Sequence, residues 1–361
     1  MNKNSSIAIV AGIAIAIAVI ASVLAFSGIS NDSTPMESPE QANLVPQAEK
    51  ITILTSFYPY HEFTKNVAGD FADVKQFMPN GVEAHDWEPR AQEIQSLKDA
   101  DVFVYNGLGM ESYIENIIES GEFDNVVFLK ASEGVELLKF EDDHDDHAKH
   151  DDHDDHDDHD KHAKEDDHDD HDEHEEGGHD GHDHDYEFDP HIWLDPILVK
   201  QQVNVIRDGL IQVDPDNKEH YEENARIYND KLDALDMKIG SALSSCQKDT
   251  IVPYHNAFTY LGERYDIHIM ALGGMAPDSE ASAAEIAEFV DFVKDNDIKV
   301  IFSEELVDPR LAEVIAEEAN AQVLLFSPLE ALSKDEAGTN VSYIDKMEDN
   351  LDSLKVALEC Q

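Results

Sequence analysis

Three histidines that lie far apart in the chain have the residue type and setting of a metal site. His85, His191 and His255 each lie in a short turn-like segment with an aromatic residue close by. Neutral imidazole is a good ligand for a borderline cation, and zinc is the first candidate. Manganese is a harder cation and would prefer more carboxylate in the set. The three segments therefore predict one zinc site whose ligands come from distant parts of the chain.

A site of three histidines leaves a fourth position for water, a carboxylate or another histidine. Zinc binding requires deprotonated imidazoles, so we expect the affinity to fall as the pH drops through about 6.5. Three histidines and a water are also a catalytic zinc arrangement, which makes a metallohydrolase one alternative function. The sequence contains no His-Glu-x-x-His motif, and no motif positions a general base.

A second, much larger group of histidines lies between residues 141 and 187, which hold 25 Asp or Glu and only three Lys. The segment has almost no apolar residues, so we expect it to be disordered without metal. Imidazole and carboxylate both bind metal ions, which favours a loop that collects or buffers metal over a purely solvating spacer. Its histidines are His144, His147, His150, His153, His156, His159, His162, His168, His171, His174, His179, His182 and His184.

The size and charge of the chain restrict its class. A length of 361 residues suggests two domains. The formal net charge of −55 argues against nucleic acid as a partner, because binding phosphates requires clustered Lys and Arg. No organic cofactor is expected.

The N-terminus is predicted to be a targeting segment. Residues 7–26 carry no charge, and as a helix they would extend about 30 Å, enough to cross a membrane. We therefore expect residues 1–26 to be a signal peptide or a membrane anchor, and residues 27–49 to be a flexible tether. In either case the folded body would lie outside the cytoplasm, in the periplasm or at the cell surface.

Short apolar runs alternate with helical patterns in both halves of the chain, which predicts two α/β lobes with parallel sheets. The first lobe is expected at residues 50–195 and the second at 248–361, with linking helices at 196–247. One of these, 218–245, would be a long rigid helix joining the lobes, with the metal site in the cleft between them. The expected strands are 51–57, 74–78, 102–105, 126–129, 250–253, 267–271, 299–302 and 322–326, and the expected helices include 60–68, 91–100, 111–120, 257–265, 282–296, 310–319 and 343–358.

The chain has two cysteines, Cys246 and Cys360. In an oxidising compartment an even number favours a disulfide, which would fasten the last helix to the start of the second lobe. The alternative is two buried free thiols.

Several motifs resemble the zinc-binding, ZnuA-like solute-binding proteins of metal ABC importers, over roughly residues 50–361. The most specific is Asp-Pro-His-Ile-Trp-Leu-Asp-Pro at 189–196, and the acidic histidine-rich insertion before it is typical of zinc members. Further matches lie at 56–59, 79–89, 255–260, 301–305 and 350–354.

The resemblance implies that His85, His191 and His255 are the metal ligands, with zinc as the transported ion. Many relatives have an aspartate where this chain has Ser327, so the resemblance leaves three histidines and water or another donor. Glu304 is a possible nearby carboxylate. The implied partners are a membrane permease and its ATPase, and the protein would not be an enzyme. A metal-buffering or adhesion protein of the cell surface is another alternative.

Overall fold

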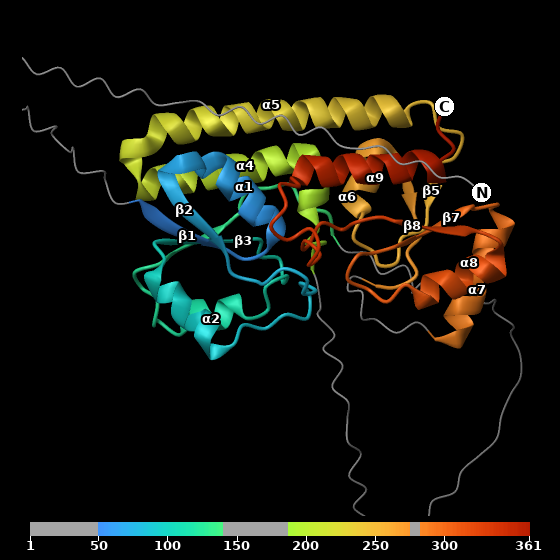
Figure 1. Ribbon diagram of the computed structural model, residues 1–361, viewed down its shortest axis with the longest axis horizontal. Coiled ribbons are helices and arrows are strands. Elements are labelled where there is room, and N and C mark those ends of the chain that lie inside the picture. The colour runs from blue at the N-terminus through green and yellow to red at the C-terminus, as the bar shows by residue number, and fades with distance from the viewer. Residues whose placement is uncertain (1–49, 140–186, 275–281) are drawn as a thin grey trace, which may run out of the picture. The chain divides into compact units, whose positions relative to one another are not determined.

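The computed structural model describes residues 50–139, 187–274 and 282–361. These residues form two α/β lobes along a long helix, α5 (Figure 1). The predicted fold class is confirmed. The histidine-rich segment, as far as residue 186, and the N-terminal apolar stretch both lie outside the described residues.

The first lobe contains a parallel sheet of four strands in the order β2-β1-β3-β4. Alternate residues of the central strands enter different cores. Ile53 and Val102 pack toward α1, α4 and α5, whereas Leu54 and Phe103 pack into a second cluster with residues of α2 and α3. Strands buried on both faces are typical of a parallel sheet. The elements are β1 (Ile51–Thr55), α1 (Tyr58–Ala68), β2 (Ala72–Gln76), α2 (Ala91–Ser96), β3 (Val102–Tyr105), α3 (Ile114–Glu119) and β4 (Val127–Lys130).

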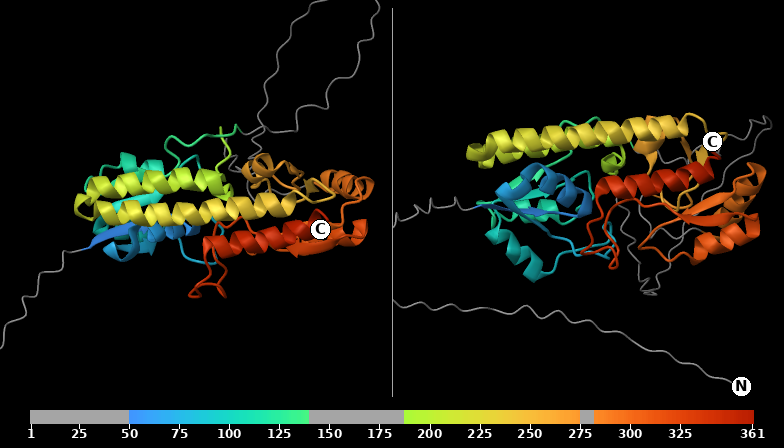
Figure 2. Two further views of the ribbon diagram at one scale, coloured as in Figure 1. Left: turned by 90° about the horizontal axis from the view of Figure 1, so that it is seen from above. Right: turned by 45° about the horizontal axis from the view of Figure 1, so that its top comes forward.

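Two antiparallel helices follow, α4 (Pro196–Val213) and α5 (Lys218–Leu243). Asp195 caps α4 by accepting hydrogen bonds from the backbone of Ile197 and Leu198. The 26 residues of α5 extend about 39 Å. This helix contacts α1 and α4 on the first-lobe side and α9 on the second-lobe side (Figures 1 and 2). It therefore links the lobes with an apolar face of Tyr221, Ala225, Tyr228, Leu232, Leu235 and Ile239, all of which are buried.

The second lobe contains two short parallel pairs, β5 with β6 and β7 with β8. A backbone hydrogen bond from Phe302 to Val252 connects the end of β5 to β7. The elements are β5 (Thr250–Ile251), α6 (Thr259–Tyr265), β6 (His268–Ile269), α7 (Ala283–Asp295), β7 (Val300–Ser303), α8 (Arg310–Ala319), β8 (Gln322–Leu325) and α9 (Tyr343–Ala357).

The strands β5 and β6 are shorter than the predicted 250–253 and 267–271. Pro253 has no N–H to donate to a ladder, which ends regular pairing at this point. Backbone hydrogen bonds from Leu272 to Pro253 and from Gly273 to Tyr254 continue the contact irregularly. The chain therefore leaves the sheet immediately before His255.

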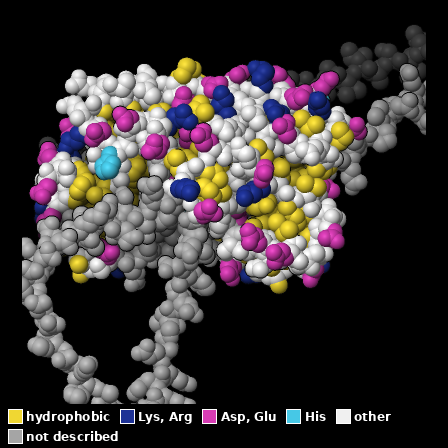
Figure 3. Space-filling view, turned by 180° about the vertical axis from the view of Figure 1, so that it is seen from behind, with side chains coloured by type: hydrophobic (Ala, Val, Ile, Leu, Met, Phe, Trp, Pro, Cys, Tyr) yellow, Lys and Arg dark blue, Asp and Glu magenta, His cyan; other side chains and the backbone are white. Residues whose placement is uncertain are grey.

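The structure joins Cys246, just after α5, to Cys360 at the end of the chain in a disulfide. Among the residues described, no helix has the length and apolar character needed to cross a membrane. On the face shown in Figure 3, basic side chains lie among acidic ones. Binding to nucleic acid would instead require a continuous basic patch.

Candidate metal centre

The three predicted histidines lie together, although they come from both lobes, and a fourth residue, Glu330, joins them. One ligand atom of each lies within 4.8 Å of those of the others. Nε2 of His85 is 3.3 Å from Nε2 of His191 and 3.3 Å from Oε1 of Glu330. The same oxygen is 3.5 Å from Nε2 of His191 and 3.5 Å from Nε2 of His255. We call these four residues the tetrad.

His85 lies in the loop between β2 and α2, whose turn is held by Glu83. The Glu83 carboxylate accepts hydrogen bonds from the backbone N–H of His85 and of Asp86, both at 3.0 Å. Glu83 also contacts Glu330, and burial together with this neighbouring charge raises the pKa of Glu83 to about 9. Glu83 thus connects the His85 loop to the fourth member of the tetrad.

His191 is oriented by Asp189, two residues earlier. Oδ1 of Asp189 lies 2.8 Å from Nδ1 of the imidazole and also accepts the backbone N–H of His191 at 2.9 Å. Asn106, at the end of β3, donates to the carbonyl of Pro190 at 3.0 Å. A carboxylate on Nδ1 fixes the ring orientation and leaves Nε2 as the ligand atom, as is usual for metal-binding histidines.

His255 has an equivalent partner in Glu304, which follows β7. Oε1 of Glu304 lies 2.6 Å from Nδ1 of His255, on the side of the ring away from the tetrad. Glu304, expected as a possible carboxylate of the site, thus lies beside the tetrad and contacts the His255 ring from behind. Glu304 therefore has the same role for His255 as Asp189 has for His191.

Glu330 lies in the loop between β8 and α9, and sequence reasoning missed it. Leu329 adopts a positive φ of 58°, in the left-handed region, and its N–H donates to Oγ of Ser327. Asn350 of α9 holds Ser327 through hydrogen bonds at 2.8 and 2.7 Å, and Trp193 donates to the carbonyl of Pro328 at 2.7 Å. Ser327 thus shapes the turn that presents the carboxylate. The signal in the sequence was a single acid among the apolar residues 328–332.

The tetrad is almost completely buried, and its charges are strongly coupled. Burial would lower the pKa of His255, but Glu304 and Glu330 outweigh burial and raise the pKa to about 10. Burial would lower the pKa of His191 as well, but Asp189 and Glu330 outweigh burial and raise this pKa. Burial lowers the pKa of His85. Burial would raise the pKa of Glu330, but the three histidines hold it well below its usual range. A metal ion that binds the tetrad would therefore have to displace protons from it.

The geometry fits zinc. A tetrahedron with bonds of about 2.0–2.1 Å has edges of about 3.3–3.4 Å, close to the distances from Glu330 to the three nitrogens. Nε2 of His255 and Oε1 of Glu330 are buried and form no hydrogen bond of ordinary geometry, and the polar atoms that face them at 3.3–3.5 Å are other members of the tetrad. Four protein donors form a closed set, whereas a catalytic zinc site keeps one position open.

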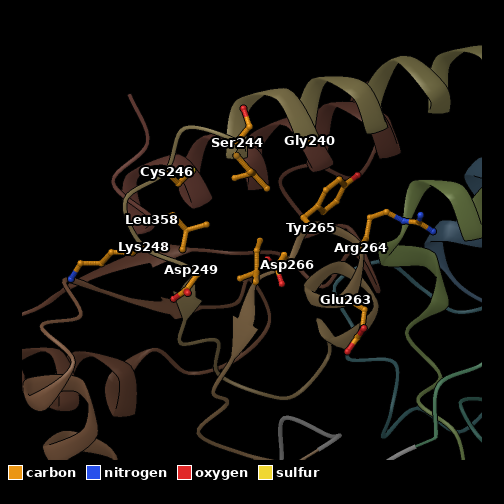
Figure 4. A pocket seen from close by; sticks show the side chains of 12 residues that line it. Gly240, Ser244, Cys246, Lys248, Asp249, Glu263, Arg264, Tyr265, Asp266 and Leu358 are labelled. Carbon is orange, nitrogen blue, oxygen red and sulfur yellow. The ribbon is translucent and has the colours of Figure 1, made fainter.

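A depression of about 500 Å³ lies away from the tetrad, near the end of α5 (Figure 4). Its lining contains no member of the tetrad and carries charges of both signs, including Lys248 and Asp249. Arg264 and Tyr265 point from this region toward α4 and α5 (Figure 4), where Arg264 bonds Asp195 and Tyr265 donates to Asp236. The described residues that line this depression include no histidine and none of the tetrad, so they do not form a second site of the same kind.

Comparisons with known proteins identify the family of the chain. A family model described as zinc-uptake complex component A, periplasmic, matches residues 53–357. The high-affinity zinc uptake system protein ZnuA of Bacillus subtilis (strain 168) is 36% identical over 313 residues, which cover 86% of this chain and 89% of that protein. The zinc-binding lipoprotein AdcA of Streptococcus pneumoniae is 36% identical over 310 residues, covering 85% of this chain and 55% of AdcA.

The solved structure of the Zn(II)-bound ZnuA-like domain of Streptococcus pneumoniae AdcA superimposes with a TM-score of 0.67 and 33% identity, covering 86% of this chain and all of that domain. The predicted resemblance is confirmed, and zinc is the solute that it implied. The metallohydrolase alternative is excluded by the family, whose members bind metal for transport. The chain belongs to the ZnuA family of zinc-uptake solute-binding proteins, which are not enzymes.

Proposed function

We propose that the chain captures one Zn²⁺ outside the cytoplasm and delivers it to the permease of an ABC importer. The observation that carries this proposal is the buried tetrad. Four of the six distances among the three imidazole nitrogens and the carboxylate oxygen are 3.3–3.5 Å, close to the edges of a zinc tetrahedron, and all four atoms lie within 4.8 Å of one another. The rings of His191 and His255 each have a carboxylate on Nδ1, which also favours zinc.

The division of the ligands between the lobes supports a role in carrying rather than permanent storage. His85 and His191 belong to the first lobe, and His255 and Glu330 to the second. A small separation of the lobes would split the tetrad into two pairs, neither of which completes a zinc site. Release to the permease would then require only a displacement at the cleft, with α5 intact.

The contacts between the lobes favour a small displacement. Tyr343 of α9 donates to the carbonyl of Trp193 at 2.8 Å, and Arg264 forms two hydrogen bonds with Asp195. One apolar core includes residues of α1, α4, α5 and α9. A wide opening would expose this core, so we expect motion of the loops that carry the ligands instead.

Three further parts of the proposal concern residues outside those described. Residues 1–26 would direct the chain out of the cytoplasm and either be removed or remain as an anchor, and residues 27–49 would form the tether. The histidines between 144 and 184 would collect zinc near the cleft, because imidazole and carboxylate both bind it. Tethering would raise the effective zinc concentration at the tetrad.

The test of capture is a zinc titration of the protein with residues 141–187 deleted, alongside the full chain. We expect one tight equivalent to survive the deletion and His191→Ala to abolish it. If all stoichiometric binding disappears with the segment, the tetrad is not the capture site.

Delivery requires a separate test. In membrane vesicles that contain a zinc ABC permease and its ATPase, uptake of radioactive zinc should depend on this protein. Vesicles that import zinc equally well with the His191→Ala variant would favour the buffering or adhesion alternative instead.

A further inference from the structure

The backbone of His191 is held on both sides by buried amide side chains. Asn106, at the end of β3, donates through Nδ2 to the carbonyl of Pro190 at 3.0 Å. Gln202 of α4 donates through Nε2 to the carbonyl of Ile192 at 3.2 Å. Both amides are 0% exposed, as is His191 itself. The carbonyls immediately before and after this ligand are therefore fixed from two different elements.

Tyr60 of α1 joins the two amides. Its hydroxyl is hydrogen-bonded to Oδ1 of Asn106 and lies 3.0 Å from Oε1 of Gln202, and the residue is also 0% exposed. Since both amide nitrogens are directed at backbone carbonyls, both oxygens face the hydroxyl, which has a single proton to donate. We call Tyr60, Asn106 and Gln202 the amide network. It connects α1, β3 and α4 to the segment that carries His191.

Glu111 holds the turn from which Asn106 extends. Its buried carboxylate accepts the backbone N–H of Asn106 at 2.8 Å and that of Gly107 at 2.9 Å. Gly107 has a φ of +82°, a conformation that favours glycine. The turn that presents the Asn106 amide is thus fixed independently of the segment around His191.

Two tyrosines from the second lobe hold the same segment further from His191. Tyr260 of α6 donates to the carbonyl of Asp189 at 2.9 Å, and Tyr343 of α9 donates to that of Trp193 at 2.8 Å. Together with the two amides, side chains therefore hold four backbone carbonyls within residues 189–193. Buried hydrogen bonds contribute little net stability over apolar packing of the same shape, but a connected network of them rigidifies what it holds. The arrangement indicates a role in positioning.

The position of His191 sets two of the short distances in the tetrad. Its Nε2 is 3.3 Å from Nε2 of His85 and 3.5 Å from Oε1 of Glu330. Zinc with four ligands fits such distances, because its bonds to nitrogen are about 2.0–2.1 Å long. Mn²⁺ is larger and prefers six ligands, so it requires these atoms to move apart. A His191 backbone that cannot shift therefore disfavours Mn²⁺ more than zinc.

We propose that the amide network determines the metal specificity of the tetrad, because it holds the backbone of His191 and so keeps the site at the size of zinc. Tyr60, Asn106 and Gln202 are positioning residues, since none of them belongs to the tetrad. The proposal rests on the function proposed above, because it takes the tetrad as the place where the captured ion binds.

The test measures the Kd of the full chain for Zn²⁺ and, separately, for Mn²⁺ by competition with a chelator. Tyr60→Phe removes the hydroxyl that joins the amides, and Gln202→Met removes the donor to Ile192 at similar side-chain size. Each variant should lower zinc affinity about tenfold, the lower end for residues that act through a ligand. Manganese affinity should change less than about twofold, because the weaker hold on His191 also lets the site expand around the larger ion. The preference for zinc should therefore fall about five- to tenfold.

Co²⁺ reports the geometry of the site directly. Its visible absorption is strong when four ligands form a tetrahedron and weak when five or six ligands surround the ion. Cobalt bound to either variant should therefore absorb less per ion than cobalt bound to the unaltered chain. Tyr221→Phe is the matched control, because it removes a tyrosine hydroxyl that donates to Asp214 at 2.6 Å, outside both the tetrad and the amide network. It should change neither the metal preference nor the cobalt spectrum.

An unchanged ratio of the two Kd values in Tyr60→Phe and Gln202→Met would overturn the proposal. This holds also when both affinities fall equally, because the network would then be structural only. An equal change of the ratio in Tyr221→Phe would overturn it as well. Chemical denaturation shows whether each variant is folded, and if Tyr60→Phe does not fold, Gln202→Met decides, since it leaves the Tyr60 hydroxyl one amide oxygen for its one proton. If His191→Ala still bound one tight zinc, the proposed function itself would fail.

Discussion

At the scale of single residues, the central feature is that one carboxylate oxygen lies within 3.5 Å of three imidazole nitrogens. Oε1 of Glu330 occupies the corner of the tetrad that the sequence left open. Without metal, Glu330 is stabilised by the histidines, which hold its pKa well below its usual range. When zinc is bound, the single negative charge of Glu330 would neutralise half of the double positive charge of the ion. The same charge of Glu330 would therefore interact with protonated imidazoles or with zinc.

Removing this charge tests the assignment of Glu330. Glu330→Gln keeps the side-chain shape but offers a neutral oxygen, so we expect zinc affinity to fall more than about 100-fold, the upper end for a supporting residue. Glu304→Gln should lower the zinc affinity about 10- to 100-fold, because Glu304 acts through His255. Competition with a zinc chelator measures both, and the exposed Glu313→Gln is the control. Equal effects at Glu330 and Glu313 would exclude Glu330 as a ligand.

Protons bound by the tetrad should make zinc binding depend on pH. The pKa of His255 is raised to about 10 and that of His191 is also raised, so at neutral pH zinc must displace protons. As the pH rises, fewer protons remain to be displaced, and the affinity should increase from pH 6 to 8 by up to about tenfold per unit for each proton. Calorimetry in buffers of different ionisation enthalpy should show proton release. An affinity independent of pH would contradict the coupling.

At the scale of the elements, each ligand belongs to a loop held by a neighbouring element. Asn350 of α9 forms two hydrogen bonds with Ser327, which shapes the turn before Glu330. A buried amide that loses such a partner leaves unsatisfied groups behind. The role of α9 is thus to position the carboxylate as well as to close the core.

Asn350→Ala should lower the free energy of unfolding by about 1–3 kcal/mol, because the backbone N–H and carbonyl of Ser327 lose their partners. It should also weaken zinc binding, since the turn that presents Glu330 loosens. Chemical denaturation and zinc titration measure the two effects. Asp352→Ala, on the exposed face of α9, should change neither. If Asn350→Ala kept the full zinc affinity, the turn at Ser327 would not be needed to position Glu330 for zinc binding.

The sequence predicted some of these elements better than others. The long helix α5 was predicted correctly because its apolar residues recur at helical spacing and are buried. The strands around Pro253 were predicted too long, since pairing depends on partners distant in sequence. Glu330 was not predicted as a ligand because a single acid among apolar residues is a weak signal that no local motif supports. Its position depends on the left-handed Leu329 and on the contact of Ser327 with Asn350.

At the scale of the whole molecule, both the beginning and the end of the second lobe are fastened near the end of α5. The long helix α5 leads into the second lobe, and the disulfide between Cys246 and Cys360 fastens the C-terminus to the same place. The tetrad lies between the lobes, and neither cysteine belongs to it. Stability and zinc affinity should therefore respond differently to the loss of the disulfide.

Replacing both cysteines by serine should lower the free energy of unfolding by about 4 kcal/mol, because the bond closes a loop of more than 100 residues in the unfolded chain. Zinc affinity should stay within about twofold of the original, well below the 1.4 kcal/mol that a tenfold change represents. Denaturation under oxidising conditions and zinc titration provide the comparison. A large loss of affinity would show that the disulfide helps to set the cleft.

The most direct measurement of the central claim is a crystal structure of the zinc-loaded protein with anomalous diffraction at the zinc edge. The expected result is a peak at about 2.0–2.2 Å from Nε2 of His85, His191 and His255 and from a carboxylate oxygen of Glu330. A peak bound by Glu304 in place of Glu330, or no zinc between the lobes while the full chain still binds zinc, would contradict the account.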